Sequence, residues 1–389
     1  MTPRPKPKWH PLPWVAEFLP WTAGLALLSF SVAASMIVHA QQTNLIPVEA
    51  PVNIALSAPS LPAPNIQSTS AEQPEEPTGA VAFAPTWVTS SDSSGNIRQD
   101  IKVENDYAVD DRVRLGLLYG QSFIYDGQAS IGNESIRDAG ITGRWRPNER
   151  LKLDGMFGVS QLGSTSNGEG QTVSKAFIPI TNIHGSYTSA EESTRIDLGF
   201  KRSIFDLSPE LVANRVVRND FVIHPQIGLQ SGWRFRELAE IGPVTSAEGN
   251  NYRYNSEFTV ARKLAKNSEL YSTFTTLHYA RASNAGYFSP TMVHNLEGGW
   301  STDVDRKSFA LSLDCGLGAG HAKEHGETFG SWGLSAHTQT DLTWKIRPGR
   351  NVHATYEFYY DQSAPPLEST QAGAWHMSIL TVSFRWSSD

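Results

Sequence analysis

Apolar and polar residues alternate near the end of the chain. From Phe309 to Ala319 every second residue is apolar or small, and Ser312 and Asp314 lie among the residues between them. The same two-residue period recurs over 331–346, 350–361 and 374–386. Side chains of a β-strand point alternately to two faces, so this period predicts four strands that each have one apolar and one polar face.

The length of these strands indicates a membrane barrel. They run for about 12 to 16 residues, whereas strands of globular proteins have about 5 or 6. A tilted strand that crosses a bilayer needs about 9 to 11 residues, with aromatic residues toward the ends of its apolar face. Such positions are held by Trp332, Trp344, Tyr360 and Trp386. The pattern predicts an all-β fold, a transmembrane antiparallel up-and-down β-barrel; a large secreted β-sandwich is the alternative.

Strand patterns continue from Val81 to the C-terminus, and no long amphipathic helix interrupts them. Fifteen segments fit a strand: 81–91, 97–108, 113–125, 134–147, 151–163, 174–187, 193–206, 226–238, 251–264, 268–281, 291–301, 307–320, 331–346, 350–361 and 374–386. Tight turns at 146–149 and 347–350 are expected at the periplasmic end. Long polar loops are expected at the extracellular end: 164–173, 239–250 and 361–373.

Counting sides around the barrel requires one more strand. Strand 193–206 runs outward when counted from a periplasmic start, and 226–238 also runs outward when counted back from a periplasmic end. An inward strand must therefore lie between Leu207 and Pro225. Its apolar residues are Val216, Val217, Phe221 and Ile223. The total becomes about 16 strands, the even number typical of single-chain bacterial barrels, with about 14 as the fallback.

The residues before the barrel are predicted to be a leader and a linker. Residues 1–40 have the layout of a secretory signal peptide, with early basic residues, an apolar run over 23–38 and a small residue, Ala40, before the expected cut at Gln41. An uncleaved inner-membrane anchor is the alternative. Residues 41–79 are rich in proline, alanine and serine, which predicts a disordered periplasmic linker. The barrel then spans 80–389.

The composition fits a barrel with a wet lumen. A mean hydropathy of −0.33 with 18% charged residues is too polar for a helical membrane protein. The net charge of −7 gives no basic footprint, so nucleic acid is excluded as a partner. Cys315 is the one cysteine of the chain, so it has no partner for an intramolecular disulfide, and its position on an apolar face predicts a lipid-facing residue.

One short motif suggests chemistry. The segment from His321 to His325 matches the H-x-x-E-H pattern of inverted zinc peptidases, in which two histidines one helical turn apart bind the metal and a glutamate acts as base. Glycines surround it, and a loop between strands is expected there, so no helix is available to hold it. We therefore expect no enzyme, no cofactor and no metal site, and an outer-membrane hydrolase remains a lesser alternative.

The polar faces of the last strands predict the lining of a channel. A barrel of this size leaves an aqueous channel, and its lining would include Asp314, His337, Gln339, Asp341, Lys345, His353, Glu357, Tyr359, Asp361 and Arg385. Both charge signs occur, so no strong ion selectivity follows. Hydroxyls, amides and aromatic rings suit a hydrated neutral sugar chain, and they also suit the water of a general diffusion porin.

A short segment between two strands adds a resemblance. Gly286-Tyr287-Phe288-Ser289-Pro290 resembles the G-Y-F-S-P-Q signature of the outer-membrane barrel at the C-terminus of cellulose synthase operon protein C, and the last strand resembles that family's closing strand. The resemblance implies a channel in the outer membrane of a Gram-negative bacterium that exports a nascent glucan without catalysis. In the loop, Tyr287 or Phe288 could stack on a pyranose ring; packing at the barrel rim is the alternative.

The chain departs from that family in one residue of the loop and in the absence of its repeat domain. Thr291 stands in place of the family's glutamine, and the family's long array of periplasmic helical repeats is missing from this sequence. The resemblance therefore implies a separate periplasmic repeat protein of a polysaccharide synthase complex, or the 41–79 linker, as the connection to the synthase. The other expected partners are the polysaccharide chain and the lipid of the outer membrane.

Overall fold

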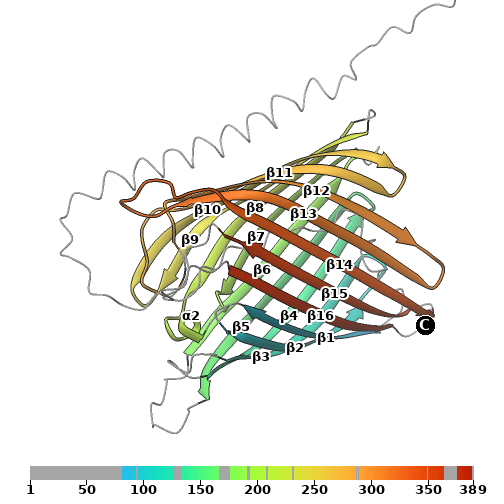
Figure 1. The fold of residues 1–389 in the computed structure, drawn as a ribbon. Coiled ribbons are helices and arrows are strands. Elements are labelled where there is room, and N and C mark those ends of the chain that lie inside the picture. Colours follow the sequence, from blue (N-terminus) through green and yellow to red (C-terminus); the bar gives the residue numbers. More distant parts are fainter. Residues whose placement is uncertain are drawn as a thin grey trace, which may run out of the picture. The chain divides into compact units, whose positions relative to one another are not determined.

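The described strands of the computed structural model form one closed antiparallel barrel (Figure 1). The structure describes residues 81–92, 95–125, 133–165, 176–190, 193–206, 209–229, 232–285, 287, 289–347, 349–362 and 375–387. Each strand pairs with its neighbours in sequence, and β1 pairs with β16 from Ala82↔Ser387 to Asp92↔Met377. Closure leaves no unpaired sheet edge, so the predicted all-β barrel is confirmed.

Sixteen strands and one short helix make up the described part of the chain. The strands are β1 (Val81–Asp92), β2 (Ile97–Ala108), β3 (Val113–Tyr125), β4 (Asn133–Asn148), β5 (Leu151–Thr165), β6 (Ala176–Thr188), β7 (Thr194–Ile204), β8 (Val217–Gly228), β9 (Trp233–Ser246), β10 (Gly249–Ala265), β11 (Ser268–Tyr279), β12 (Met292–Asp305), β13 (Phe309–Lys323), β14 (Gly333–Arg347), β15 (Arg350–Asp361) and β16 (Trp375–Ser387). The helix is α2 (Pro209–Ala213). No helix among the described residues is long and apolar enough to cross a membrane.

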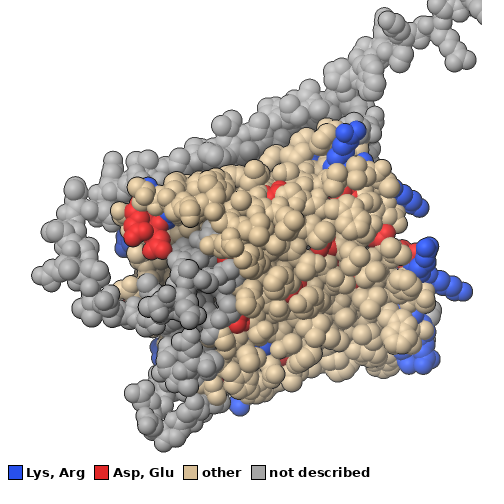
Figure 2. Space-filling model, in the orientation of Figure 1, with Lys and Arg blue, Asp and Glu red and all other residues tan. Residues whose placement is uncertain are grey.

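The two faces of each strand have opposite surroundings. Along β14, Leu342 and Trp344 are exposed on the outer wall, whereas His337 and Asp341 are buried on the inner face. This is the apolar-out, polar-in alternation of a membrane barrel. Figure 2 shows an outer wall with few lysine or arginine side chains, which gather mainly at the end that holds the C-terminus.

The lengths of the connections identify the two ends. The turn between β4 and β5 consists of two residues, and Oδ1 of Asn148 accepts hydrogen bonds from the backbone nitrogens of Arg150 and Leu151, both at 2.9 Å. The β14–β15 turn is equally tight, with Gly349 at φ 70°, a conformation that favours glycine. Both predicted turns lie at this end, where β1 begins and β16 ends, and short turns mark the periplasmic side.

The region between β7 and β10 corrects part of the sequence prediction. The extra strand expected between Leu207 and Pro225 exists as β8, so the count of 16 is confirmed. The predicted strand 226–238 and loop 239–250 are wrong, because β9 begins at Trp233 and continues to Ser246. The polar residues that resemble a loop face the lumen instead: Glu240 lies 2.8 Å from the guanidinium of Arg253.

Several predictions fall on residues that the structure does not describe. The leader, 1–40, and the linker, 41–79, both precede the first described residue. The predicted loop 164–173 continues past Thr165, and the loop 361–373 continues past Gln362, into residues outside the described ranges.

Candidate functional site: the lumen and its extracellular mouth

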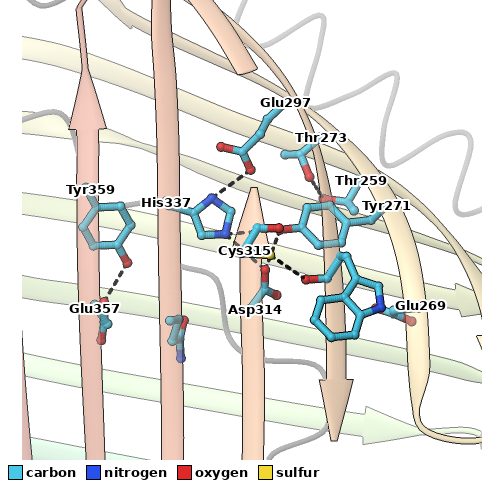
Figure 3. Close-up of polar contacts among 12 residues, drawn as sticks. Thr259, Glu269, Tyr271, Thr273, Glu297, Asp314, Cys315, His337, Glu357 and Tyr359 are labelled. Atoms are coloured by element: carbon cyan, nitrogen blue, oxygen red, sulfur yellow. Dashed lines mark hydrogen bonds and ion pairs between the residues drawn. The ribbon is translucent and has the colours of Figure 1, made fainter. Parts of the chain in front are cut away.

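A buried polar network covers the inner face of β11 to β14 (Figure 3). The hydroxyl of Tyr271 donates to Oδ1 of Asp314 at 2.5 Å. The imidazole of His337 lies between two carboxylates, with Nδ1 2.9 Å from Glu297 and Nε2 3.1 Å from Asp314. An imidazolium in this place forms ion pairs with both carboxylates, donates a hydrogen bond from Nε2 to Asp314, and offsets one of the two negative charges. Four strands thus contribute one group each to a connected wall of donors and acceptors.

The polar wall continues along β14 and β15. Asp341 accepts hydrogen bonds from Nε2 of Gln339 at 2.8 Å and from Oγ1 of Thr355 at 2.7 Å. Nε2 of His353 lies 3.6 Å from the same carboxylate.

The wall ends in an aromatic pair. The hydroxyl of Tyr359 donates to Glu357 at 2.6 Å, and its ring stacks against His337 with centroids 6.4 Å apart. Carboxylates, hydroxyls and flat rings therefore alternate over this sector of the lumen.

Glycines in the wall make room for the large side chains. A Cβ atom placed on Gly299 would lie 2.2 Å from the ring of Tyr271, and one placed on Gly316 would lie 2.4 Å from Glu297 and 2.6 Å from His337. A side chain at either position would force the tyrosine, glutamate or histidine to move from its place in the wall. The rings can lie flat against the wall only because β12 and β13 carry glycine at these points.

The lumen contains space that water can enter. Asp154 and Lys201 lie on inward faces of β5 and β7, opposite in direction to the exposed Phe157 and Leu198 on the outer wall. The side chain of Asp154 is nevertheless 43% exposed, and Lys201 is also exposed. Inward-pointing charges that remain exposed indicate open, hydrated volume beside these strands, as expected for a barrel of 16 strands.

A buried charge cluster lies toward the extracellular ends of β8 to β10. The side chain of Arg253 is 0% exposed and contacts Glu240 at 2.8 Å and Asp220 at 3.2 Å. Arg218 contacts Asp220 at 2.8 Å, and its guanidinium lies over the ring of Phe205, 5.2 Å from the centroid. Two arginines and two carboxylates balance each other, so the cluster fixes the wall without adding net charge.

The β7–β8 connection folds over the extracellular mouth. It contains α2, which lies at the end of the barrel opposite the C-terminus (Figure 1). Leu211 of α2 packs into an apolar cluster with Phe205, Val216, Val244, Leu277, Tyr279, Ala285, Tyr287 and Val293. Val212 packs into a second cluster with Ile124, Ile136, Leu162, Ile178, Ile204 and Val217. The helix therefore joins apolar residues of β3–β8 to those of β9–β12 and narrows the mouth.

Polar contacts hold this connection in place. Asp206 forms an ion pair of 2.6 Å with Arg98 at the extracellular end of β2, five strands away from β7. On the other side, Nδ2 of Asn214 donates to the carbonyl of Ala285 in the β11–β12 loop at 3.2 Å. The connection is thus tied to the wall on one side and to a second loop on the other.

The loop singled out by sequence belongs to this mouth. Tyr287 is 3% exposed, with its ring 5.4 Å from Tyr279, and its hydroxyl accepts a hydrogen bond from Asn251 at 3.2 Å. Burial raises the pKa of the Tyr287 phenol, so it stays protonated. Ser289 accepts a backbone hydrogen bond from Ser283 at 2.8 Å, and Pro290 is fully buried. Gly286 and Phe288 lie outside the described residues, and a contact of this loop with sugar stays a prediction.

All ten residues predicted to line the lumen lie on the inner face of the barrel. Asp314, His337, Gln339, Asp341, His353, Glu357 and Tyr359 belong to the wall described above. Lys345, which contacts Asp305 at 3.2 Å, and Arg385, which pairs in register with Asn351, lie near the periplasmic end. Asp361 is buried at the extracellular end of β15.

The two histidines of the H-x-x-E-H segment do not form a metal site. His321 lies in β13, where its ring stacks on Trp332 with centroids 4.0 Å apart. His325 lies in the loop beyond β13, and burial lowers its pKa. Among the described residues, no group of three or more histidine, cysteine, aspartate or glutamate side chains is arranged to hold a metal ion.

Sequence reasoning missed several members of the site. Tyr271 and Glu297 complete the His337 network, and Arg253 forms the centre of the charge cluster. The signal for Tyr271 was its place between the polar residues Glu269 and Thr273 on the inner face, with a glycine, Gly299, opposite it in the neighbouring strand. No local signal indicated that α2 and the residues up to Val216 pack against apolar clusters at the mouth.

Comparisons with known proteins show the fold. No family model and no curated protein matches this sequence. A solved structure described as a bacterial polysaccharide outer membrane secretin matches with a TM-score of 0.59 at 12% identity, covering 80% of this chain and 99% of the other. A BenF-like porin from Pseudomonas fluorescens Pf-5 matches with a TM-score of 0.42 at 10% identity, covering 80% of this chain and 99% of the other.

Fold and lumen together define the class of the protein. The chain is an outer-membrane β-barrel of the Gram-negative type, and its polar lumen is hydrated beside β5 and β7.

Proposed function

We propose that this barrel is the outer-membrane exit channel for an exopolysaccharide, cellulose or a related glucan. The observation that carries the proposal is the inner face of β11 to β15, a wall of hydrogen-bonding groups packed with tyrosine and histidine rings, with Glu357 and His353 partly exposed on it. The hydrated space of the lumen lies beside β5 and β7. The likeness in fold to a polysaccharide outer membrane secretin, over nearly all of that structure, supports the same function.

The chemistry of this wall suits a glucan. A pyranose presents hydroxyl groups around its edge and apolar C–H groups on its faces. Partly exposed groups such as Glu357 and His353 can exchange hydrogen bonds with sugar hydroxyls. The rings of Tyr359 and His337 are 5% and 4% exposed, so they build the wall, and Tyr359 positions Glu357 through its hydrogen bond. Because basic and acidic side chains pair within the lumen, the wall provides polar contacts without a single strong field. This favours a neutral polymer and requires no catalytic step.

The mouth and the periplasmic end define the path of the polymer. In this proposal the polysaccharide enters between the short periplasmic turns and moves along the β11–β15 wall. It leaves past the β7–β8 and β11–β12 loops. Tyr287 then meets the sugar only when these loops move apart, because its ring is buried in the present arrangement. A separate periplasmic repeat protein delivers the polymer from its synthase.

Adjacent tyrosines of β15 provide the experiment. Tyr359 faces the lumen and Tyr360 faces outward, so Tyr359→Ala tests the channel and Tyr360→Ala is the matched control. We expect cello-oligosaccharides to block single-channel current through the purified protein. Loss of the Tyr359 hydroxyl releases Glu357 from its position on the wall, and one misplaced hydrogen-bond acceptor, worth about 0.5–1.5 kcal/mol, should raise the blocking concentration roughly 2- to 10-fold in Tyr359→Ala only.

Two results would oppose the proposal. Equal block by unrelated oligosaccharides of the same size would indicate a general diffusion porin. Unchanged surface glucan in a deletion strain of a glucan-producing host would remove the export function.

A further inference from the structure

The periplasmic rim carries a recess that the channel function does not use. Its volume is about 1080 Å³, and it lies among the β2–β3 turn, the β4–β5 turn and the end of β6. Four basic side chains line it, Arg112, Arg146, Arg150 and Lys152, against two acidic ones, Asp111 and Glu149. The excess of positive charge fits an anionic ligand.

The turns hold the basic residues at the recess. Oδ1 of Asp110 accepts hydrogen bonds from the backbone nitrogens of Arg112 at 2.7 Å and Val113 at 2.8 Å. Asn148 caps the backbone of Arg150 in the same way at 2.9 Å. Side-chain oxygens are thus used to fix the backbone of both turns, and Arg112 and Arg150 project from them as exposed residues.

Like charges gather on the inner side of the recess. The ammonium group of Lys152 is repelled by the positive charges of Arg146 and Arg195. The negative charge of Asp154 offsets part of this repulsion. An anion placed here would relieve this repulsion. Figure 2 shows lysine and arginine side chains gathered at the periplasmic end of the barrel, where the C-terminus lies.

The outer side of the recess is apolar and faces lipid. Leu151 and Tyr187 belong to its lining, and Tyr187 is 44% exposed on the outer wall. Trp145 lies nearby on the outer face of β4 and is 48% exposed. Aromatic rings at strand ends mark the membrane interface, so the recess lies at the level of the headgroups of the inner leaflet.

We propose that this recess binds an anionic phospholipid of the inner leaflet. The phosphate lies at the rim beside Arg112 and Arg150, with Arg146 and Lys152 on the lumen side of the recess. The start of the acyl chains lies against Leu151 and Tyr187 on the lipid side. Basic pockets at membrane surfaces recognise anionic headgroups in this way. A lipid fits better than an acidic polymer or peptide because the recess combines its basic residues with an apolar side open to the bilayer.

Native mass spectrometry of the delipidated, full-length protein tests the proposal. The protein is titrated with phosphatidylglycerol and, separately, with phosphatidylethanolamine. The variant is Arg112→Gln with Arg150→Gln, and the control is Arg306→Gln with Lys307→Gln, which removes the same charge from exposed residues of the β12–β13 turn on the same rim. Heat-modifiable migration confirms that each protein is folded.

We expect phosphatidylglycerol to bind more tightly than phosphatidylethanolamine. Each basic contact to an anionic lipid contributes about fivefold in affinity. The recess variant removes two such contacts, so its affinity for phosphatidylglycerol should fall roughly 30-fold, whereas the control variant should keep its affinity. Inorganic phosphate should compete only weakly, because it lacks the acyl chains.

Three results would overturn the proposal. Equal losses in the two variants would show that charge anywhere on the rim suffices. Equal binding of the two lipids would remove the role of the anionic headgroup. Binding of polyglutamate, but not of phosphatidylglycerol, that is lost in the recess variant would assign the recess to an acidic polymer or peptide. No arm of this test contains polysaccharide, so its failure leaves the proposed export function untouched.

Discussion

Tyr271 reaches Asp314 by lying across a glycine of the intervening strand. The two residues belong to β11 and β13, and Gly299 of β12 lies beneath the tyrosine ring. The hydrogen bond of 2.5 Å therefore requires glycine at position 299 as well as its two partners. Residues that bear no functional group can thus decide the shape of the lumen wall.

Gly299→Ala should destabilise the barrel by about 1–3 kcal/mol, the usual cost of overpacking. The added Cβ would lie 2.2 Å from the ring and hydroxyl of Tyr271, which must then leave Asp314. Gly298→Ala is the control, because the nearest atom to its added Cβ is 3.9 Å away. Urea unfolding of the purified protein in liposomes measures both. Equal stability of the two variants would show that the ring moves aside at no cost.

Arg253 stabilises the wall by charge: its guanidinium forms ion pairs with two carboxylates. Its side chain is fully buried between Glu240 and Asp220. Arg253→Ala should cost about 3–5 kcal/mol, since two carboxylates are left near each other with less compensation. Arg262→Ala, at an exposed position of the same strand, should have a small effect. The temperature at which half of each variant loses heat-modifiable migration measures the effect. A similar decrease for the two variants would argue against a stabilising role of the buried charge cluster.

At the scale of the strand, β14 provides the sharpest test of register. Leu342 faces lipid and Thr343 faces the lumen, one residue apart and near the middle of the strand. Leu342→Arg should oppose insertion by about 2–4 kcal/mol if the residue lies at the bilayer midplane. Thr343→Arg should insert normally and reduce the conductance. Equal yields of folded barrel from the two variants would refute the assigned faces.

The strands that sequence predicts well are those with strong contrast between faces. In β14 the exposed Leu342 and Trp344 alternate with the buried His337 and Asp341, so both the strand and its lumen face follow from the sequence. In β9 the inner face holds Glu240 close to Gly242 and Pro243, which locally resembles a loop. Its strand character depends on pairing with β10 and on the ion pair to Arg253.

Contacts between distant strands set the limit of prediction for the site. Sequence periodicity places His337 on the lumen face, but its contacts with Glu297 and Asp314 follow from the register of three strands. The ion pair between Arg98 and Asp206 joins segments 108 residues apart. Nothing in the local composition of either segment encodes such a contact, so the mouth could be found only in the folded barrel.

For the whole molecule, the two ends differ in how they connect the strands. The periplasmic end has tight turns between β4 and β5 and between β14 and β15, whereas α2 and the β11–β12 loop pack together at the extracellular end. Apolar packing of Leu211 and Val212 provides most of the contact between α2 and the wall. The described loops at the extracellular end therefore place apolar side chains across part of the mouth.

Leu211→Ala with Val212→Ala should open the mouth. Both side chains are almost fully buried, so their truncation removes the packing that joins α2 to the two apolar clusters, while the strands keep their own pairing. We expect a higher single-channel conductance and a larger size limit for sugars in liposome swelling. Asp206→Asn, which breaks the ion pair with Arg98, should act in the same direction with a smaller effect. Leu117→Ala, on the outer wall, is the control. If heat-modifiable migration shows folded barrels and the conductance of all the variants equals that of the wild type, the constriction lies elsewhere, along the β11–β15 wall.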